Sequence, residues 1–309
     1  MAESDSFSTP IQKSTRVFFI INKYAGTGFE QKVEGRIIDS CSRLNIEATI
    51  EYTQARGHAT ELAQLASAQG FERVFVMGGD GTVNEAAQGL VHTGAALGIL
   101  PGGSGNGLAR HLSIPLKLQR ALHLLKEYQT IQMDTLVING HRSVNVSGIG
   151  FDAHVASQFG SDGKRGLAGY AKLILKEFLR FREFATRAIL DDCEEDHVAF
   201  ILALANSSQF GNNAKVAPYA SVCDGVMDVC FVRKVPFTQA IPFTARMFTG
   251  RIDRSSYVTI RKTTKFSTVL LHPQPFHIDG EPYPPATRFD AVVDPGSLKM
   301  IVPKSGSGF

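Results

Sequence analysis

The sequence has no tryptophan and few cysteines. Its four cysteines are Cys41, Cys193, Cys223 and Cys230. They form no Cys-x-x-Cys pair and have no nearby histidine at zinc-ligand spacing, which argues against a zinc module and against a disulfide-stapled secreted domain. A chain with reduced thiols is typical of the cytoplasm.

Net charge and long apolar runs are scarce as well. The 32 lysines and arginines against 29 aspartates and glutamates give a net charge of +3, too little to predict a nucleic-acid partner. The longest apolar run, residues 198–205, suits a buried strand and is much shorter than the roughly 20 residues of a transmembrane helix. Residues 1–5 are acidic and polar, unlike a signal peptide. The sequence therefore predicts a cytoplasmic protein without a membrane-spanning segment.

What the sequence does contain divides into two unlike halves. At about 150 residues per domain, 309 residues predict two domains. Residues 1–139 hold 12 basic and 13 acidic residues, whereas the remainder holds 20 and 16. Glycine is concentrated before residue 112, and phenylalanine and proline after residue 139. We expect one domain at residues 1–137 and a second at 138–294, each large enough for its own hydrophobic core.

Strand and helix patterns alternate along the first half. The predicted strands are residues 17–21, 47–53, 73–77 and 97–100, and the predicted helices are residues 29–44, 57–69 and 82–91. This alternation predicts a parallel sheet with right-handed crossovers, in which ligands bind at the carboxyl ends of the strands.

Three glycine-rich loops follow these strand ends, at residues 22–28, 78–82 and 101–107. Glycine lets backbone N–H groups approach a phosphate closely, and the N-terminus of the following helix adds a favourable dipole. A single loop of this kind is equally explained by a tight turn without a ligand, but three at one sheet edge favour a phosphate site. None has the spacing of a P-loop or of a dinucleotide-binding motif, so ordinary NTPases and dehydrogenases are disfavoured.

The second glycine loop contains an acidic residue, Asp80. A carboxylate among phosphate-facing amides repels phosphate unless a divalent cation lies between them, and Mg²⁺ supplies such a bridge. The alternative is that Asp80 caps the helix predicted to begin at Thr82. The flanking glycines favour the magnesium ligand.

Three segments carry a resemblance to a known family. They are residues 78–85 (GGDGTVNE), residues 100–110 (LPGGSGNGLAR) and residues 279–281 (DGE). Together they resemble the diacylglycerol kinase catalytic-domain family, which includes soluble bacterial lipid kinases and sphingosine kinases and is related in fold to NAD kinases and phosphofructokinases. The likeness extends over residues 17–302.

The resemblance implies both a fold and an activity. The fold is an N-terminal α/β nucleotide-binding domain, like that of NAD kinases and phosphofructokinases, followed by a C-terminal antiparallel β-sandwich that receives the lipid. Residues 295–309 are expected to pack back on the first domain. The activity is transfer of the γ-phosphate of ATP, with Mg²⁺, to a hydroxyl of diacylglycerol or of a related lipid such as a sphingoid base.

The resemblance also assigns a nucleotide site residue by residue. The implied nucleotide-binding residues are Asn22, Gly26, Gly28, Thr53, Gly78, Gly79, Asp80, Gly81, Thr82, Asn84, Glu85, Gly103 and Ser104. Asp80 would in addition organise the catalytic magnesium. The first loop departs from the family's usual Asn-Pro-x-Ser-Gly, because Lys23 and Ala25 stand in place of proline and serine. The second loop therefore carries the resemblance better than the first.

A second magnesium site is implied in the second half. Its ligands would be the carboxylate of Asp224 and the backbone carbonyls of Ser221 and Val226. The alternative is a hairpin turn, because Asp224 and Gly225 lie between strand-like runs and Asp-Gly is a strong hairpin signal. The two interpretations are compatible.

The motif at residues 279–281 supplies two candidate bases. Phosphorylation of an alcohol needs a base within hydrogen-bond reach of the hydroxyl. The resemblance favours Glu281 as the base, with Asp279 assisting through the metal or the nucleotide; the reverse assignment and a plain surface turn stay open. Asp152 matches a family position near the lipid head group, where a carboxylate suits a hydroxyl or ammonium group, and a turn cap is the alternative.

The second half is rich in short β-type runs separated by proline and Asp/Gly turns, as in an antiparallel sandwich. The predicted strands are residues 143–147, 197–205, 227–232, 256–261, 268–271 and 291–293. Residues 163–187 contain seven lysines and arginines against two glutamates, interleaved with leucine and phenylalanine. This segment suits a helix on an anionic membrane surface, and a solvated helix packed on the sandwich is the alternative.

The leading hypothesis is therefore a lipid kinase that uses ATP and Mg²⁺ and meets its substrate at the inner face of the membrane. Two other hypotheses stay open. One is an NAD-kinase-like enzyme that phosphorylates a soluble alcohol, and the other is a non-catalytic lipid- or nucleotide-binding protein. The joint presence of Asp80, Asp279 and Glu281 disfavours the non-catalytic protein. The sequence indicates no oligomeric state, and a homodimer stays open.

Overall fold

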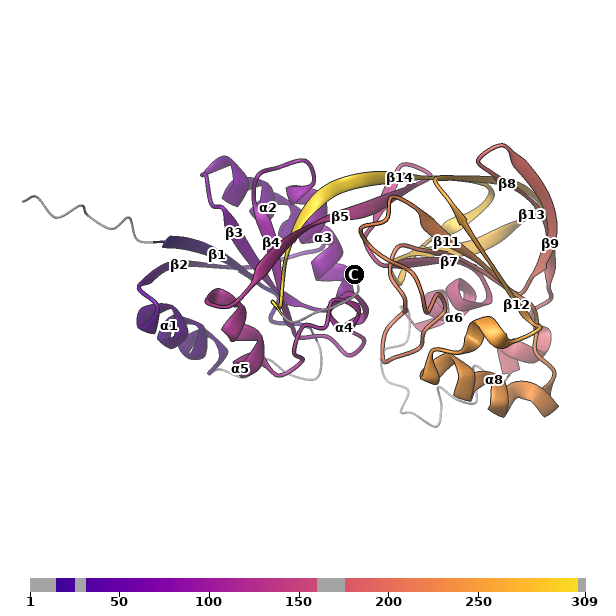
Figure 1. Ribbon diagram of the computed structural model, residues 1–309, viewed down its shortest axis with the longest axis horizontal. Helices are drawn as coiled ribbons and strands as arrows, with labels where there is room; N and C mark the ends of the chain where they lie inside the picture. The colour runs from indigo at the N-terminus through magenta and orange to yellow at the C-terminus, as the bar shows by residue number, and fades with distance from the viewer. Residues whose placement is uncertain (1–14, 26–31, 160–175, 305–309) are drawn as a thin grey trace, which may run out of the picture.

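The computed structural model describes residues 15–25, 32–159 and 176–304 of the chain. These residues form two lobes whose strands belong to one continuous sheet (Figure 1). The first lobe is an α/β domain and the second is built mainly of antiparallel strands, which confirms the predicted fold class.

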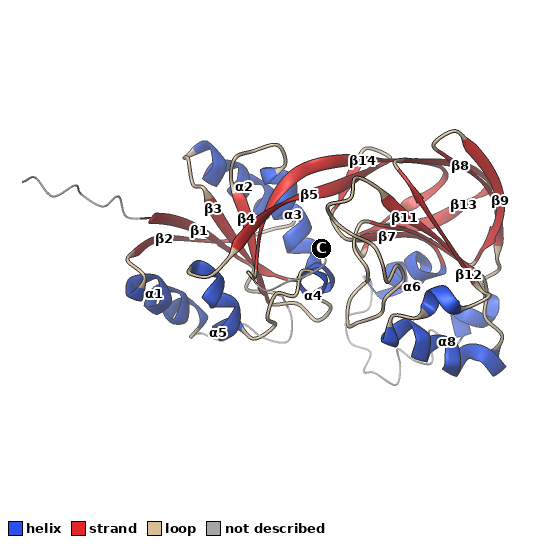
Figure 2. Ribbon diagram, in the orientation of Figure 1, coloured by secondary structure: helices blue, strands red, loops and turns tan. Residues whose placement is uncertain are grey.

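The first lobe contains a parallel sheet in the order β2-β1-β3-β4. Its strands are β1 (Thr15–Ile21), β2 (Ile46–Tyr52), β3 (Arg73–Gly78) and β4 (Ala96–Pro101), and its helices are α1 (Val33–Arg43), α2 (His58–Ala68) and α3 (Asp80–Leu90), followed by the short α4 (Gly107–His111), α5 (Leu118–Ala121) and η1 (Leu122–Leu125). Figure 2 shows α2 and α3 on one side of this sheet and α1 and α5 on the other. Because both faces are covered, the central strands read as continuous apolar runs.

Helix α3 begins two residues earlier than the sequence predicted, at Asp80, and its N-cap residue is Gly79. The N-cap residue makes no side-chain capping hydrogen bond to this helix. The interpretation of Asp80 as a cap of α3 is therefore wrong, because its carboxylate turns to the start of α4 and accepts the N–H of Gly107.

The second lobe is a set of antiparallel ladders. Its strands are β6 (His141–Ser143), β7 (Val146–Gly150), β8 (Phe184–Leu190), β9 (Cys193–Ala199), β10 (Ile201–Ala205), β11 (Met227–Val232), β12 (Val258–Thr263) and β13 (Lys265–Ile278). The long strands β5 (Gln129–Ile138) and β14 (Glu281–Val302) contribute to the cores of both lobes. The helices of the second lobe are α6 (Phe151–Phe159), α8 (Phe237–Thr249) and the turn η2 (Ile252–Arg254). Helices α6 and α8 lie on the same side of these strands (Figure 2).

Two predicted strands are interrupted. The expected strand 143–147 breaks between β6 and β7, because the N–H groups of Val144 and Asn145 donate to the Asp279 carboxylate at 2.8 and 3.1 Å. The expected strand 197–205 breaks at Phe200, so that β9 pairs with β8 while β10 pairs with β11. A run of β-forming residues does not reveal which partner each N–H will find.

Strand β14 connects the two lobes. It pairs with β13 and β5 in antiparallel fashion, and its Met300 pairs in parallel with Leu97 of β4. The last residues of β14 belong to the buried core of the first lobe. This return strand holds the β13–β14 hairpin of the second lobe against the first.

The basic segment 163–187 is described only in part. Residues 163–175 lie outside the described residues, 176–180 are helical, and 184–187 begin β8. Among the helices that the structure describes, none is both long enough and apolar enough to cross a membrane.

Candidate functional site

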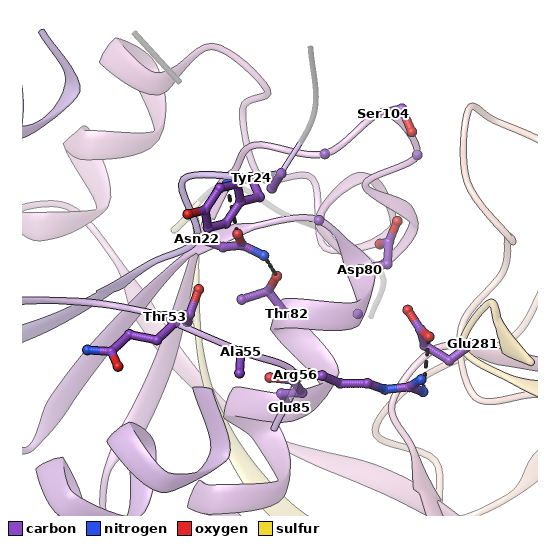
Figure 3. Close-up of a pocket in the computed structure, with 16 residues that line it drawn as sticks. Asn22, Tyr24, Thr53, Ala55, Arg56, Asp80, Thr82, Glu85, Ser104 and Glu281 are labelled. Atoms are coloured by element: carbon purple, nitrogen blue, oxygen red, sulfur yellow. Dashed lines mark hydrogen bonds and ion pairs between the residues drawn. The ribbon is translucent and has the colours of Figure 1, made fainter. Parts of the chain in front are cut away.

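A cleft of about 520 Å³ lies where the two lobes meet (Figure 3). The loops that follow β1, β2, β3 and β4 line most of it, and Glu281, at the start of β14, faces it from the second lobe. The carboxyl ends of the parallel strands thus form one wall, as expected for a sheet of this topology.

Most of the predicted nucleotide-binding residues line this cleft. They are Asn22, Thr53, Gly79, Asp80, Gly81, Thr82, Glu85, Gly103 and Ser104. Gly78 and Asn84 do not line it: a Cβ at Gly78 would lie 2.6 Å from that of Thr82, and Asn84 is buried between the lobes. Gly26 and Gly28 lie outside the described residues.

The second and third glycine loops pack backbone against backbone. A Cβ atom at Gly103 would lie 2.5 Å from the Cα of Gly79, so a side chain there would push the loops apart. The N–H of Gly102 donates to the carbonyl of Gly78 at 2.9 Å. Asn106 closes the third loop, because its side-chain amide accepts the N–H of Gly103 at 3.0 Å and donates to the Gly103 carbonyl at 2.7 Å.

The first loop is tied to α3 by side chains. Nδ2 of Asn22 donates to the Thr82 hydroxyl at 2.9 Å, and Oδ1 of Asn22 accepts the N–H of Tyr24 at 2.9 Å. Figure 3 shows both contacts beside the second loop. The three loops therefore form one connected edge of the cleft.

The Asp80 carboxylate is half-buried between the second and third loops. Its Oδ1 accepts the N–H of Gly107 at 2.7 Å. Burial raises the pKa of Asp80 above its usual range; the Gly107 N–H opposes this, and the negative charge of Asp279 adds to it. A carboxylate whose ionised form is destabilised by burial gains much from a neighbouring cation.

Asp279 and Gly280 form the two-residue turn of the β13–β14 hairpin, so the predicted turn is present. Both have positive φ, 48° and 92°, as in the type I′ turns for which Asp-Gly is preferred. Unlike a surface turn, however, Asp279 is only 6% exposed. Tertiary contacts therefore decide what this carboxylate does.

The Asp279 carboxylate accepts hydrogen bonds from four donors. These are the Ser143 hydroxyl at 2.6 Å, the N–H of Val144 at 2.8 Å, the N–H of Asn145 at 3.1 Å and Nδ2 of Asn84 at 2.8 Å. The first three belong to the second lobe and Asn84 belongs to α3, so Asp279 joins the two lobes. Its oxygens are engaged with the protein, and Asp279 is not among the residues that line the cleft.

Glu281 points into the cleft (Figure 3). Its Oε2 lies 3.1 Å from Nη2 of Arg56, and its Oε1 lies 3.0 Å from where a Cβ at Gly81 would be. The carboxylate thus sits over the first turn of α3, where the helix dipole favours negative charge.

Asp152, the second residue of α6, contacts His277, a residue that was not predicted from the sequence. Its Oδ2 lies 3.0 Å from Nε2 of the buried His277, and Nδ1 of His277 accepts the N–H of Gly280 at 3.0 Å. Because Nδ1 is an acceptor, the proton of the neutral imidazole is on Nε2 and points to Asp152. Oδ1 of Asp152 is buried, and among residues 15–25, 32–159 and 176–304 it has no hydrogen-bond partner.

Two other residues of the site were not predicted from the sequence. Arg56 follows the predicted strand 47–53 at the ligand-binding edge of the sheet, and this position was its only signal. Asn106 has a φ of 49°, a left-handed conformation that asparagine tolerates well, but its sequence gave no indication of which backbone it would clamp.

The predicted second magnesium site stays a prediction. Oδ2 of Asp224 lies 2.8 Å from Nζ of Lys262, so an ammonium group already neutralises it. Oγ of Ser221 accepts the N–H of Cys223 at 3.3 Å, and Oδ1 of Asp224 accepts the N–H of Val226 at 3.4 Å. Across residues 15–25, 32–159 and 176–304, no three His, Cys, Asp or Glu side chains gather as a metal cluster.

Both lobes match protein families. Residues 16–138 match the diacylglycerol kinase catalytic domain, and residues 145–302 match the YegS C-terminal NAD kinase beta sandwich-like domain. The two matches follow one another along the chain, in the order of the two lobes.

Relatives and solved structures agree with these matches. The chain is 28% identical to a "Probable lipid kinase YegS-like" of Chromohalobacter salexigens, over 96% of both proteins, and 29% identical to a protein of the same name from Pseudomonas aeruginosa, over 83% of this chain and 85% of the relative. A diacylglycerol kinase structure from Bacillus anthracis shares the fold, with a TM-score of 0.75 at 20% identity over 95% of this chain and 98% of that one. The chain therefore belongs to the diacylglycerol kinase catalytic-domain family, in the form that carries a YegS-type C-terminal domain, and it is a kinase.

Proposed function

We propose that this protein transfers the γ-phosphate of ATP to a hydroxyl of diacylglycerol or a closely related lipid. The observation that carries the proposal is the cleft, in which glycine loops and Asp80 of the first lobe face Glu281 of the second. We propose residues 1–137 as the nucleotide domain, with 295–309 packing back on it, and 138–294 as the lipid domain. The names of the curated relatives support a lipid as the acceptor.

The glycine loops suit the phosphates of ATP. Glycine at positions 79 and 103 keeps the backbone bare at the cleft, so that N–H groups can approach phosphate oxygens. The N-terminus of α3 begins at the same place and adds a favourable dipole. Arg56 lines the same cleft, where it pairs with Glu281, and its guanidinium could bind a phosphate oxygen as well.

The residues of the cleft fit a magnesium ion that is held jointly with phosphates. Mg²⁺ commonly binds one or two carboxylates together with substrate phosphates, and does not need a cage made of protein alone. Asp80 lines the cleft, and a cation would stabilise the ionised form of its half-buried carboxylate. Asp80 would hold the ion, which would supply neutralisation of the phosphate charge.

Glu281 is the better candidate for the base. It faces the cleft, whereas Asp279 accepts four hydrogen bonds from the protein. In the proposed step the lipid oxygen forms a bond to the γ-phosphorus while the bond to the bridging oxygen of ADP breaks. The hydroxyl proton passes to the Glu281 carboxylate.

Asp152 is proposed to hold the lipid head group. Its buried Oδ1 has no partner among the residues that the structure describes, and a hydroxyl of the acceptor would satisfy it. His277 joins Asp152 to the turn that carries Glu281, so the acceptor and the base are held by one network.

The test is incubation of the purified protein with radiolabelled ATP, Mg²⁺ and mixed lipid vesicles. We expect labelled lipid from the wild type, none from Asp80→Ala, and a loss of about 10²–10⁴-fold in kcat for Glu281→Gln. Glu51→Gln, an exposed glutamate of β2, is the matched control.

Undiminished labelling by Asp80→Ala, or the absence of any labelled lipid from the wild type, would overturn the proposal. Equal labelling of a soluble alcohol without vesicles would favour the NAD-kinase-like alternative.

A further inference from the structure

Helix α8 presents an apolar stripe to solvent. Phe237, Ile241 and Phe248 are 54%, 84% and 51% exposed, and Ala245 between them is exposed as well. These residues are four, four and three positions apart, so they lie on one face of the helix. Globular helices normally bury such a stripe, which marks this one as a surface that meets a partner.

The other side of α8 fixes the helix to the protein. Phe243 packs against the buried cluster that includes Val216 and Val232, and the carbonyl of Met247 accepts the N–H of Lys215. The exposed stripe is thus a second apolar face, additional to the one that holds the helix in place.

A neighbouring segment extends the stripe. Residues 176–180 are helical, Leu179 is 60% exposed, and the rings of Phe178 and Phe237 pack with their centroids 5.4 Å apart. Nζ of Lys234 donates to the carbonyl of Phe181 at 2.6 Å, which ties this segment to the start of α8. We call Leu179 and the four stripe residues the α8 face.

The surroundings of the α8 face are predominantly basic. Between Asp228 and Asp253 the sequence has no acidic residue and four basic ones. They are Arg233, Lys234, Arg246 and Arg251. The neighbouring segment adds the exposed Lys176, Arg180 and Arg182, and its two acidic residues pair within the protein, Glu177 with His154 and Glu183 with Arg233.

An aromatic cluster leads inward from the α8 face to the proposed acceptor site. The ring of Phe178 packs on Phe151 with centroids 5.8 Å apart, and Phe151 stacks on Phe200 at 4.5 Å. Phe151 is the residue immediately before Asp152. The surface and the candidate head-group site are therefore joined by continuous apolar packing.

We propose that the α8 face docks on the surface of an anionic lipid bilayer, with the apolar stripe in the head-group region and the basic residues around it against lipid phosphates. This inference rests on the proposed lipid substrate. An apolar stripe with a basic surround is the pattern of interfacial helices. A second copy of the chain is a poorer occupant, because a two-fold dimer would set these like charges against one another.

The test is co-sedimentation of the full chain, without ATP, with vesicles of phosphatidylcholine alone or mixed with phosphatidylglycerol. We expect binding to the mixed vesicles that weakens with added salt. The double variant Ile241→Glu with Phe248→Glu should lower this binding by about tenfold or more. Ile38→Glu with Leu65→Glu, at two exposed apolar residues of the first lobe, is the matched control and should bind like the wild type.

A second variant tests the charges with little risk to folding. Arg246→Gln with Arg251→Gln should weaken binding and reduce its salt dependence, whereas Arg43→Gln with Arg120→Gln, exposed arginines of the first lobe, should not. With a short-chain diacylglycerol in solution, the apolar double variant and the arginine double variant, together the α8-face variants, should keep the wild-type kcat/KM. With substrate embedded in vesicles, the kcat/KM of both should fall.

The outcomes separate this inference from the proposed function. Vesicle binding by a protein that labels no lipid would contradict the kinase proposal alone. Wild-type vesicle binding by both α8-face variants would overturn the docking surface. A wild-type dimer that the α8-face variants dissociate, without change in vesicle binding, would also overturn it and assign the face to self-association.

Discussion

Nε2 of His277 lies 3.0 Å from Oδ2 of Asp152, while the other nitrogen of the same ring accepts the N–H of Gly280. One buried imidazole thus contacts both the proposed acceptor site and the turn that carries the proposed base. His277 is a positioning residue in this arrangement, because it acts through its neighbours and not on the substrate.

Replacing His277 separates these two contacts. We expect His277→Phe to lower kcat/KM for the lipid by roughly tenfold, because two hydrogen bonds are lost, and to leave the KM for ATP within about twofold. His277→Asn places an acceptor near the Nδ1 position and should restore kcat, whereas His277→Gln places a donor near Nε2 and should restore the KM for the lipid. Steady-state kinetics with each substrate varied measures this.

The control for this series is His272→Phe, an exposed histidine of the same strand. Its kinetics should match the wild type. If all three His277 variants lost kcat/KM to the same extent, with no difference between the effects on kcat and on the KM for the lipid, His277 would have a purely structural role.

Asp279 and Glu281 should differ sharply when replaced. Asp279→Ala leaves four donors without an acceptor and puts alanine at a φ of 48°, so we expect the free energy of unfolding to fall by about 3 kcal/mol or more. Glu281→Gln breaks an exposed ion pair with Arg56 and should change stability by less than about 1 kcal/mol while lowering kcat. Urea denaturation of both variants provides the comparison, and equal midpoints would contradict it.

The close approach of the glycine loops makes a prediction about nucleotide binding. Gly103→Ala places a Cβ 2.5 Å from the Cα of Gly79, so the loops must separate, and we expect the KM for ATP to rise about tenfold or more. Gly35→Ala is a matched control on α1, where no described residue has an atom within 4 Å of the added atom. It should leave the KM unchanged and raise stability by about 0.5–1 kcal/mol. An unchanged KM in Gly103→Ala would refute the loop packing.

His111 gives stability a defined dependence on pH. Its Nδ1 lies 3.0 Å from the Ser208 hydroxyl, and burial, with a smaller effect of the positive charge of Lys215, lowers its pKa from 6.5 to about 4. Below pH 6.5 His111 binds a proton in the unfolded chain but stays neutral in the folded chain until about pH 4. The free energy of unfolding should therefore fall as the pH drops toward 4. The loss should reach about 3 kcal/mol at most.

His111→Asn removes this dependence, because asparagine offers an acceptor but no titrating group. Thermal unfolding measured from pH 7.5 to pH 4 should show a shallower decline for His111→Asn than for the wild type. His123→Asn, at an exposed histidine of the same lobe, should follow the wild-type curve. Parallel curves for His111→Asn and the wild type would disprove the assignment.

Much of the first lobe was predictable from the sequence because its signals are local. The apolar run at residues 17–21 and the glycines at 78–82 and 101–107 each specify a strand or a turn with little help from distant residues. The parallel order of the strands then brings those loops to one edge. For this reason nine of the predicted nucleotide-binding residues line one cleft.

The second lobe was harder to predict because its contacts are distant in the chain. Whether residues 143–147 form one strand depends on a carboxylate more than 130 residues away, at Asp279. The same contact decides that Asp279 is a buried link between the lobes while Glu281, two residues on, faces the cleft. His277 and Arg56 entered the site in the same way, through partners that no spacing in the sequence reveals.

The sequence alone determined that this chain has an α/β half with glycine loops for phosphate and a β-rich half with acidic turn residues, since backbone preference and apolar periodicity are properties of neighbouring residues. Only the tertiary structure decided which carboxylate faces the cleft, which carboxylate has its oxygens fully hydrogen-bonded to the protein, and which helix leaves an apolar stripe exposed to solvent. Those outcomes depend on burial and on hydrogen-bond partners, and the return of β14 to the first lobe sets both across the whole length of the chain.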